Sequence, residues 1–137
     1  MLIRPTVFFV LVSALWLALA GCGTPTPPEI KAVGSATVTV DATNRRTSAR
    51  VALANEVTLV LPPANPAGYV WQISAHDSRF LKQRTEITAD ADPEKGSTVA
   101  FLALRLGLTR IRFVLVKSAG QREIDPVDFR EVELTIQ

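Results

Sequence analysis

The stretch 59–71, LVLPPANPAGYVW, constrains the fold of this chain more than any other part of the sequence. It contains three residues that have no backbone donor to offer to a β-ladder: Pro62, Pro63 and Pro66. The last of these prolines sets Asn65 in an extended conformation, and Gly68 allows the positive φ that closes a turn. Tyr69 and Trp71 then lie two residues apart, on one face of a strand. The stretch predicts a strand, a stiff loop that can present its backbone to a partner at low entropic cost, and a second strand.

Short apolar runs separated by turn residues recur roughly every 8–12 residues along the rest of the chain. We expect strands over 35–41, 50–54, 56–61, 68–74, 98–106, 108–117 and 127–136, a loop over 42–48, and loose alternation over 79–88. The pattern predicts an all-β, immunoglobulin-like antiparallel β-sandwich of seven or eight strands. A helix over 98–106 is the alternative there, because Ala, Leu and Arg are good helix formers.

Two features of the last strands can be predicted in more detail. Gly107 marks a tight corner between two long apolar runs, and we expect an exposed face of that hairpin to carry Arg105, Arg110 and Arg112. In the final run, an apolar set is expected to alternate with polar residues and to form the buried face: Phe129, Val132, Leu134 and Ile136.

Residues 1–21 have the form of a bacterial lipoprotein signal peptide. Arg4 precedes an apolar run, 7–20, that is too short to span a membrane and typical of a signal sequence. The run ends in Leu-Ala-Gly-Cys, a lipobox, which places Cys22 where a thioether to diacylglycerol forms. Cys22 is the single cysteine of the chain, so an intrachain disulfide is excluded. We expect lipidation at Cys22, where two or three acyl chains such as palmitate give lasting attachment. An ordinary cleaved signal is the alternative.

The predicted mature chain has a tether and one domain. Residues 22–34 comprise the lipidated cysteine and a Pro/Thr-rich extended spacer, and 35–137 form the β-sandwich domain. Gly23 follows the cysteine where Asp would retain a lipoprotein in the inner membrane, so we expect the outer membrane, facing the periplasm. Loss of Arg4 from 15 Lys+Arg leaves 14 against 13 Asp+Glu, with no block of like charge. The sequence therefore implies no nucleic acid and no anionic lipid as a partner.

Motifs for catalysis are weak. His76 is the only histidine and stands in His76-Asp77-Ser78, but three successive side chains diverge and cannot form a nucleophile, base and acid relay. We interpret this tripeptide as a surface turn. The sequence has no nucleophile elbow, phosphate loop or zinc spacing, so we predict that the chain is not an enzyme and needs no cofactor.

An alternate acidic spacing at Asp90, Asp92 and Glu94 is that of a calcium loop. However, Gly96 falls one position late, and Phe101 stands where the bidentate Glu is required. We therefore predict no metal site there.

The run Leu-Pro-x-x-Asn-Pro-x-Gly-Tyr-x-Trp resembles the chagasin family of cysteine-peptidase inhibitors, and the similarity extends from about residue 49 to 137. The resemblance implies an immunoglobulin-like sandwich that presents three loops at one end. In that family the loops enter the cleft of papain-like peptidases as a wedge, without covalent chemistry.

The resemblance places the peptidase-binding loops within 63–68, 93–97 and 117–123. The matching positions are Asn65, Pro66, Ala67 and Gly68 in the first loop, Glu94, Lys95 and Gly96 in the second, and Lys117, Ser118 and Ala119 in the third. The first loop is one residue shorter than Asn-Pro-Thr-Thr-Gly and lacks both threonines, and the second has one glycine of Gly-x-Gly-Gly. The third loop keeps a basic residue but lacks the Pro and Trp of Arg-Pro-Trp, and a Trp commonly supplies much of an interface's energy.

Two functions are therefore expected. In the first, a membrane-anchored lipoprotein binds and inhibits a papain-like cysteine peptidase, with 65–68 as the central wedge and Lys117 as a flanking anchor. In the second, the sandwich is a non-inhibitory structural or adaptor module that binds another envelope protein. Framework residues report fold and loop residues report function, so the altered loops keep both open, with small-ligand binding as a remoter option.

Overall fold

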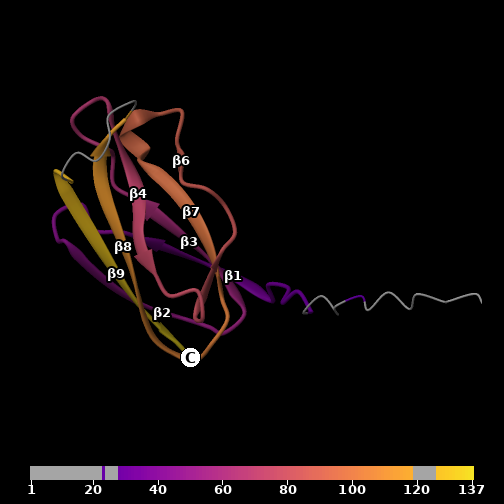
Figure 1. Cartoon of the computed structure of the whole chain (residues 1–137). Helices are drawn as coiled ribbons and strands as arrows, with labels where there is room; N and C mark the ends of the chain where they lie inside the picture. Colours follow the sequence, from indigo (N-terminus) through magenta and orange to yellow (C-terminus); the bar gives the residue numbers. More distant parts are fainter. Residues whose placement is uncertain (1–22, 24–27, 119–125) are drawn as a thin grey trace, which may run out of the picture.

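The computed structural model describes residue 23 and residues 28–118 and 126–137. In these ranges nine strands form two sheets that pack face to face, and the one helical turn is a 3₁₀ turn, η1 (Pro93–Lys95) (Figure 1). The prediction of an all-β sandwich is confirmed. The helical alternative over 98–106 is wrong, because residues 97–103 form a central strand.

The first sheet has the strand order β1-β3-β7-β5, with β6 also paired to β7. Its strands are β1 (Gly34–Thr39), β3 (Asn55–Leu61), β5 (Leu81–Gln83), β6 (Thr88–Ala89) and β7 (Ser97–Ala103). The second sheet has the order β2-β9-β8-β4. Its strands are β2 (Arg46–Val51), β4 (Tyr69–His76), β8 (Gly107–Lys117) and β9 (Asp128–Ile136).

Both sheets are mixed, which corrects the prediction of a purely antiparallel sandwich. The pairs β1–β3 and β2–β9 are parallel, whereas the other strand pairs are antiparallel. The chain runs along β1 at the edge of one sheet, crosses to the edge of the other as β2, and returns as β3. Strands β1 and β3 therefore run in the same direction side by side.

Strand β2 lies partly in a segment predicted to be a loop. Its side chains alternate between exposed and half-buried until Val51, because β2 is an edge strand with one face turned to solvent. Because its residues 46–50, RTSAR, are mostly polar, a search for apolar runs does not predict β2 in full.

The core lies between the sheets and is filled by residues that alternate along the strands. Phe101 on β7 and Phe113 on β8 are its largest fully buried side chains. The other main members are Val57, Leu59, Leu61, Trp71, Leu81, Val99, Ile111, Leu115, Val132, Leu134 and Ile136. Burial of this apolar surface stabilises the fold by roughly 25 cal/mol per Å².

The register of β9 corrects one prediction about its buried face. Arg130 points inward with Val132, Leu134 and Ile136, whereas Phe129 lies on the outer face. Phe129 cannot share a face with Val132, because they are three residues apart and strand faces alternate with period two. The outer position suits Phe129 because the guanidinium groups of Arg45 and Arg112 lie 4.8 Å and 4.4 Å from its ring centroid.

The arginine prediction is confirmed in its main point. Arg110 and Arg112 project from the exposed face of β8, and Arg105 is exposed in the turn before it. Arg110 Nε lies 3.0 Å from a carboxylate oxygen of Glu133 on β9.

The sandwich has two ends with different contents. One end carries residues 62–68, 90–96 and 118, and we call it the loop end (Figure 1). The opposite end carries residues 52–54, 77–80, 104–106 and the C-terminus, and we call it the terminal end. Strand β1 starts at the terminal end, since Gly34 pairs with Asn55. Cys22 and most of residues 1–27 lie outside the described residues, and within the described part of the chain no helix has the length and apolar character needed to cross a membrane.

A glycine pair at the loop end gives a test of the packing. Gly96 and Gly68 both have positive φ, +78° and +88°, so alanine at either should cost about 1–2 kcal/mol. A Cβ at Gly96 would also lie 1.9 Å from the carbonyl oxygen of Leu61, whereas a Cβ at Gly68 would meet nothing within 4 Å. Gly96→Ala should therefore lower the free energy of unfolding by about 3 kcal/mol or more in urea titration, and Gly68→Ala by clearly less. Equal costs would contradict this packing.

Candidate functional site

Three segments far apart in the sequence meet at the loop end. The β3–β4 loop (62–68) lies beside the start of the β8–β9 connection, where the amide of Ser118 donates to the carbonyl oxygen of Gly68 at 2.6 Å. The β6–β7 loop (90–96) lies on the other side, because Gly96 packs directly against the carbonyl of Leu61. Figure 1 shows the β3–β4 loop and η1 together at the end opposite the C-terminus.

The β3–β4 loop combines an exposed tip with a fixed base. The four tip residues are exposed to solvent: Asn65, Pro66, Ala67 and Gly68. Ala64 packs against the core just before them, and the amide of Tyr69 donates to the carbonyl oxygen of Pro66 at 3.3 Å just after them. The Asn65–Pro66 peptide bond is cis.

Trp71 holds the base of this loop from the core side. Its ring is 4% exposed, and its Nε1 donates to the carbonyl oxygen of Pro62 at 2.8 Å. Because proline interrupts the strand ladder at this point, the tryptophan supplies a fixed partner to a carbonyl that β-pairing leaves free. The aromatic that the sequence places two residues after Tyr69 is therefore both a core residue and the support of the loop.

The β6–β7 loop is held by its own carboxylates. The Asp90 carboxylate accepts from the amide of Asp92 at 2.8 Å, and the Asp92 carboxylate accepts from the amide of Glu94 at 3.0 Å, capping η1. Glu94 and Lys95 are exposed, whereas Gly96 is buried. The structure thus assigns Gly96 to the support of the loop and leaves the other two side chains free to meet a partner.

The third loop is described only at its root. Lys117 is exposed and pairs with Tyr69 across β8 and β4, and Ser118 is exposed beside Gly68. Ala119 lies outside the described residues, as does the rest of 119–125.

Arg130 is a residue of this end that the sequence reading missed. Its side chain is nearly buried and reaches across to the β1–β2 loop, where Nε donates to the Asp41 carbonyl at 3.0 Å and Nη2 to the Ala42 carbonyl at 2.8 Å. Nη1 donates to the Asp128 carboxylate at 2.7 Å, and the guanidinium carbon lies 5.7 Å from the centroid of the Trp71 ring. One buried cation thereby joins three segments: the β1–β2 loop, the start of β9 and β4. The period of β9 could have found it, because Arg130 falls on the face of Val132.

The β1–β2 loop adds a further rigid turn to this end. The carboxylate of Asp41 accepts four hydrogen bonds, from the backbone amides and side chains of Thr43 and Asn44 at 2.7–3.0 Å. Hydrogen bonding by the backbone of Asn44, followed by its side chain, holds the pKa of Asp41 well below its usual range. The Asp41 carboxylate is therefore charged at physiological pH.

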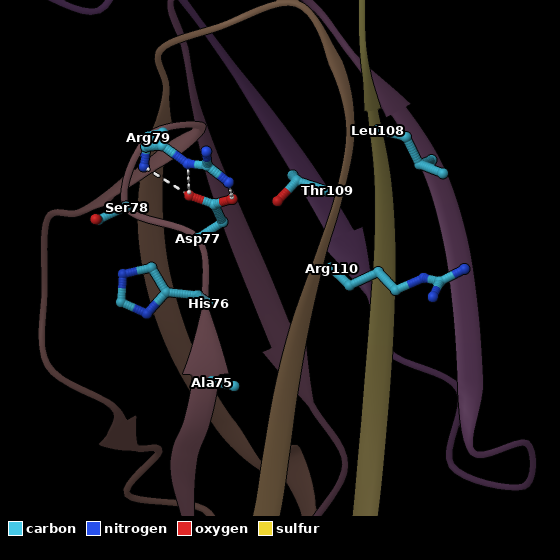
Figure 2. Close-up of a pocket in the computed structure, with 8 residues that line it drawn as sticks. All are labelled: Ala75, His76, Asp77, Ser78, Arg79, Leu108, Thr109 and Arg110. Atoms are coloured by element: carbon cyan, nitrogen blue, oxygen red, sulfur yellow. Dashed lines mark hydrogen bonds and ion pairs between the residues drawn. The ribbon is translucent and has the colours of Figure 1, made fainter.

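His76, Asp77 and Ser78 line an open hollow of about 730 Å³ at the terminal end (Figure 2). The Asp77 carboxylate is paired with Arg79 through two hydrogen bonds, of 3.0 Å and 2.7 Å, and the hydrogen bond from the Arg79 side chain lowers the pKa of Asp77 to about 2. The His76 ring packs edge-on against Phe101, with centroids 5.4 Å apart. Figure 2 shows no hydrogen bond that joins His76, Asp77 and Ser78 to one another, which agrees with a surface turn.

In the part of the chain that the structure describes, no group of three His, Cys, Asp or Glu side chains gathers in a way that could hold an ion. One carboxylate oxygen of Asp90 and one of Asp92 accept from backbone amides, as described above.

Comparison with known proteins gives the fold and no sequence family. No family model matches the chain, and no curated protein matches it by sequence. Among solved structures, the cysteine protease inhibitor EhICP2 from Entamoeba histolytica superposes with a TM-score of 0.59 at 14% identity, covering 75% of this chain and 97% of that one. PbICP-C, in a structure in complex with falcipain-2, superposes with a TM-score of 0.50 at 9% identity, covering 74% of this chain and 98% of that one.

The first of these neighbours is named as a cysteine protease inhibitor, and the likeness covers nearly the whole length of both neighbours. The resemblance seen in the sequence is thereby confirmed at the level of the fold: strands β1 to β9 form a sandwich of the kind found in chagasin-family inhibitors.

Proposed function

We propose that this chain is a membrane-anchored lipoprotein whose β-sandwich binds and inhibits papain-like cysteine peptidases by inserting its loop end into the peptidase cleft. The central wedge is the tip 65–68. Glu94 and Lys95 contact the partner on one side, and Lys117 and Ser118 contact it on the other. No covalent chemistry is involved, and no cofactor or metal is needed.

One observation carries the proposal: the exposed tip of the β3–β4 loop stands on a base that hydrogen bonds hold at three points. Asn65 to Gly68 are exposed, while the loop is fixed at Pro62 by Trp71, at Pro66 by Tyr69 and at Gly68 by Ser118. A loop that is already ordered loses little conformational entropy on binding. This is the property that a non-covalent wedge requires.

The neighbours in solved structures support the class of partner. One of them is a cysteine protease inhibitor and another is described in complex with falcipain-2, and both share the overall arrangement of strands of this chain. The identity of 9–14% leaves the loop sequences free to differ, so the proposal for this chain depends on its own loops.

The shortened loops favour a second candidate, an adaptor of the cell envelope. The first loop has no threonine, and Lys117-Ser118 has neither the proline nor the aromatic of the family's third loop. In this alternative the same rigid end binds another envelope protein and no peptidase.

Inhibition of papain separates the two candidates. The detergent-solubilised chain should inhibit papain with a Ki below about 1 μM, equivalent to roughly 8 kcal/mol of binding. Ala67→Asp should raise this Ki about tenfold or more, because it places a charge and added bulk at the exposed tip. Ala52→Asp, the same change at an exposed position of the terminal end, should leave it unaltered. No inhibition at high micromolar concentration would favour the adaptor, and equal effects of the two variants would exclude the wedge.

Trp71→Phe tests the support of the wedge. Loss of the hydrogen bond to Pro62 should cost about 0.5–1.5 kcal/mol and weaken inhibition by roughly twofold to tenfold. Ile136→Val, a core truncation at the terminal end with a similar cost to stability, is the matched control and should leave Ki unchanged. If both variants weaken inhibition in proportion to their stability, the tryptophan has no special role in positioning the loop.

The anchor has its own test. Cells that express the chain and are fed labelled palmitate should incorporate the label into it, because Cys22 supplies the thiol of the lipobox. Cys22→Ala should abolish incorporation and release the chain from the membrane fraction. Labelling of the Cys22→Ala chain would show that the lipobox interpretation is wrong.

A further inference from the structure

Exposed apolar side chains are concentrated away from the loop end. Seven large apolar residues are exposed in the described part of the chain, and five of them belong to segments that form the terminal end or lead into it. These five are Ile30, Val33, Leu53, Leu106 and Leu108. Leu106 and Leu108 alone are 58% and 54% exposed. An apolar set of this kind on a domain surface marks a site of interaction.

Backbone hydrogen bonds hold these segments together as one surface. The amide of Val33 donates to the carbonyl oxygen of Ala54, and the amide of Leu53 donates to that of Gln137, both at 3.0 Å. Gly107 pairs with Ile136 next to the C-terminus. The apolar residues thus stand on short turns that are tied to their neighbours, and the surface is rigid.

Basic charge accompanies the apolar residues. Asp77 is paired with Arg79, and Glu29 with Arg84 at 3.1 Å. The two remaining cations of these segments are Lys31 and Arg105, and neither forms an ion pair with any described residue. The Asp77 carboxylate, already paired with Arg79, is also close enough to Arg105 for the two charges to attract. The fold therefore collects a basic and apolar surface that the near-neutral overall composition conceals.

The tether decides what this surface faces. It enters the domain at Gly34, at the terminal end, and five residues, 23–27, lie between Cys22 and Pro28. The six Cα steps from Cys22 to Pro28 reach at most about 20 Å. The six Cα steps of β3 likewise span about 20 Å between the terminal end and the loop end. The tether is thus no longer than the sandwich and joins it at the terminal end, so a lipid on Cys22 favours that end at the bilayer.

We propose that the terminal end is a membrane-docking surface: Leu53, Leu106 and Leu108 rest in the headgroup region of the bilayer, with Arg105 and Lys31 beside anionic lipid. This inference rests on the proposed lipidation of Cys22. It adds an orientation, in which the loops at the opposite end point away from the membrane toward the solvent. Interfacial apolar groups of this kind lie about 5–10 Å into the headgroup and acyl boundary.

Fluorescence quenching by brominated lipid tests the orientation. The lipidated full chain is reconstituted in vesicles of phosphatidylcholine and phosphatidylglycerol with brominated acyl chains, as Leu106→Trp and, for the loop end, as Ala67→Trp. Both positions are exposed, so neither change disturbs the core. Relative to unbrominated vesicles, Leu106→Trp should lose emission, while Ala67→Trp should match the unsubstituted chain, whose Trp71 is buried.

The contrary outcomes can be told apart. Equal signals from the two variants in chains that float with the vesicles would overturn the orientation and leave the anchor intact. A chain that carries no lipid and does not float would contradict both. A tryptophan at position 106 that is shielded from water but not quenched by bromine, together with a dimer in sedimentation, would assign the surface to a second copy of the chain. That result would overturn the proposal. Failure to inhibit papain would leave the quenching result unaffected.

Discussion

The side chain of Trp71 connects the core of this protein to its most exposed loop. Its ring is packed between the sheets, and its one polar atom donates to Pro62 at the point where prolines end the ladder of β3. Arg130 lies against the same ring and fixes the β1–β2 loop and the start of β9 through four hydrogen bonds. Removal of this arginine would leave the half-buried carbonyl of Asp41 and the carboxylate of Asp128 without this donor, which costs stability. The geometry of the loop end depends on these two side chains.

The loops at the loop end are held by hydrogen bonds and packing within the domain. The turns at Asp41 and at Asp90–Glu94 are closed by carboxylates that accept backbone amides, and Gly96 fits against the carbonyl of Leu61. Such turns hold their shape without a partner. The tip 65–68 is consequently presented at a fixed height above the sandwich, which is what insertion into a preformed cleft needs.

The sequence predicted the parts of the fold that depend on local chemistry. The prolines and the glycine between 62 and 68 specify a loop whatever the tertiary context. The alternation of apolar and polar residues over β3, β8 and β9 specifies strands with one buried face. It failed where tertiary context decides. Strand β2 is polar because it is an edge, and the parallel pairing of β1 with β3 arises only when the chain changes sheets. The convergence of the three loops came from the family resemblance, whereas the buried Arg130 was open to a stricter reading of the period of β9.

Amide hydrogen exchange of the chain with and without papain shows directly whether the loop end is the binding surface. Binding through the loop end predicts slowed exchange in 64–68, 94–97 and 117–118 on addition of papain, with no change in 52–54 and 104–108. Slowed exchange on the outer face of β2, β8 and β9, with none at the loops, would contradict it.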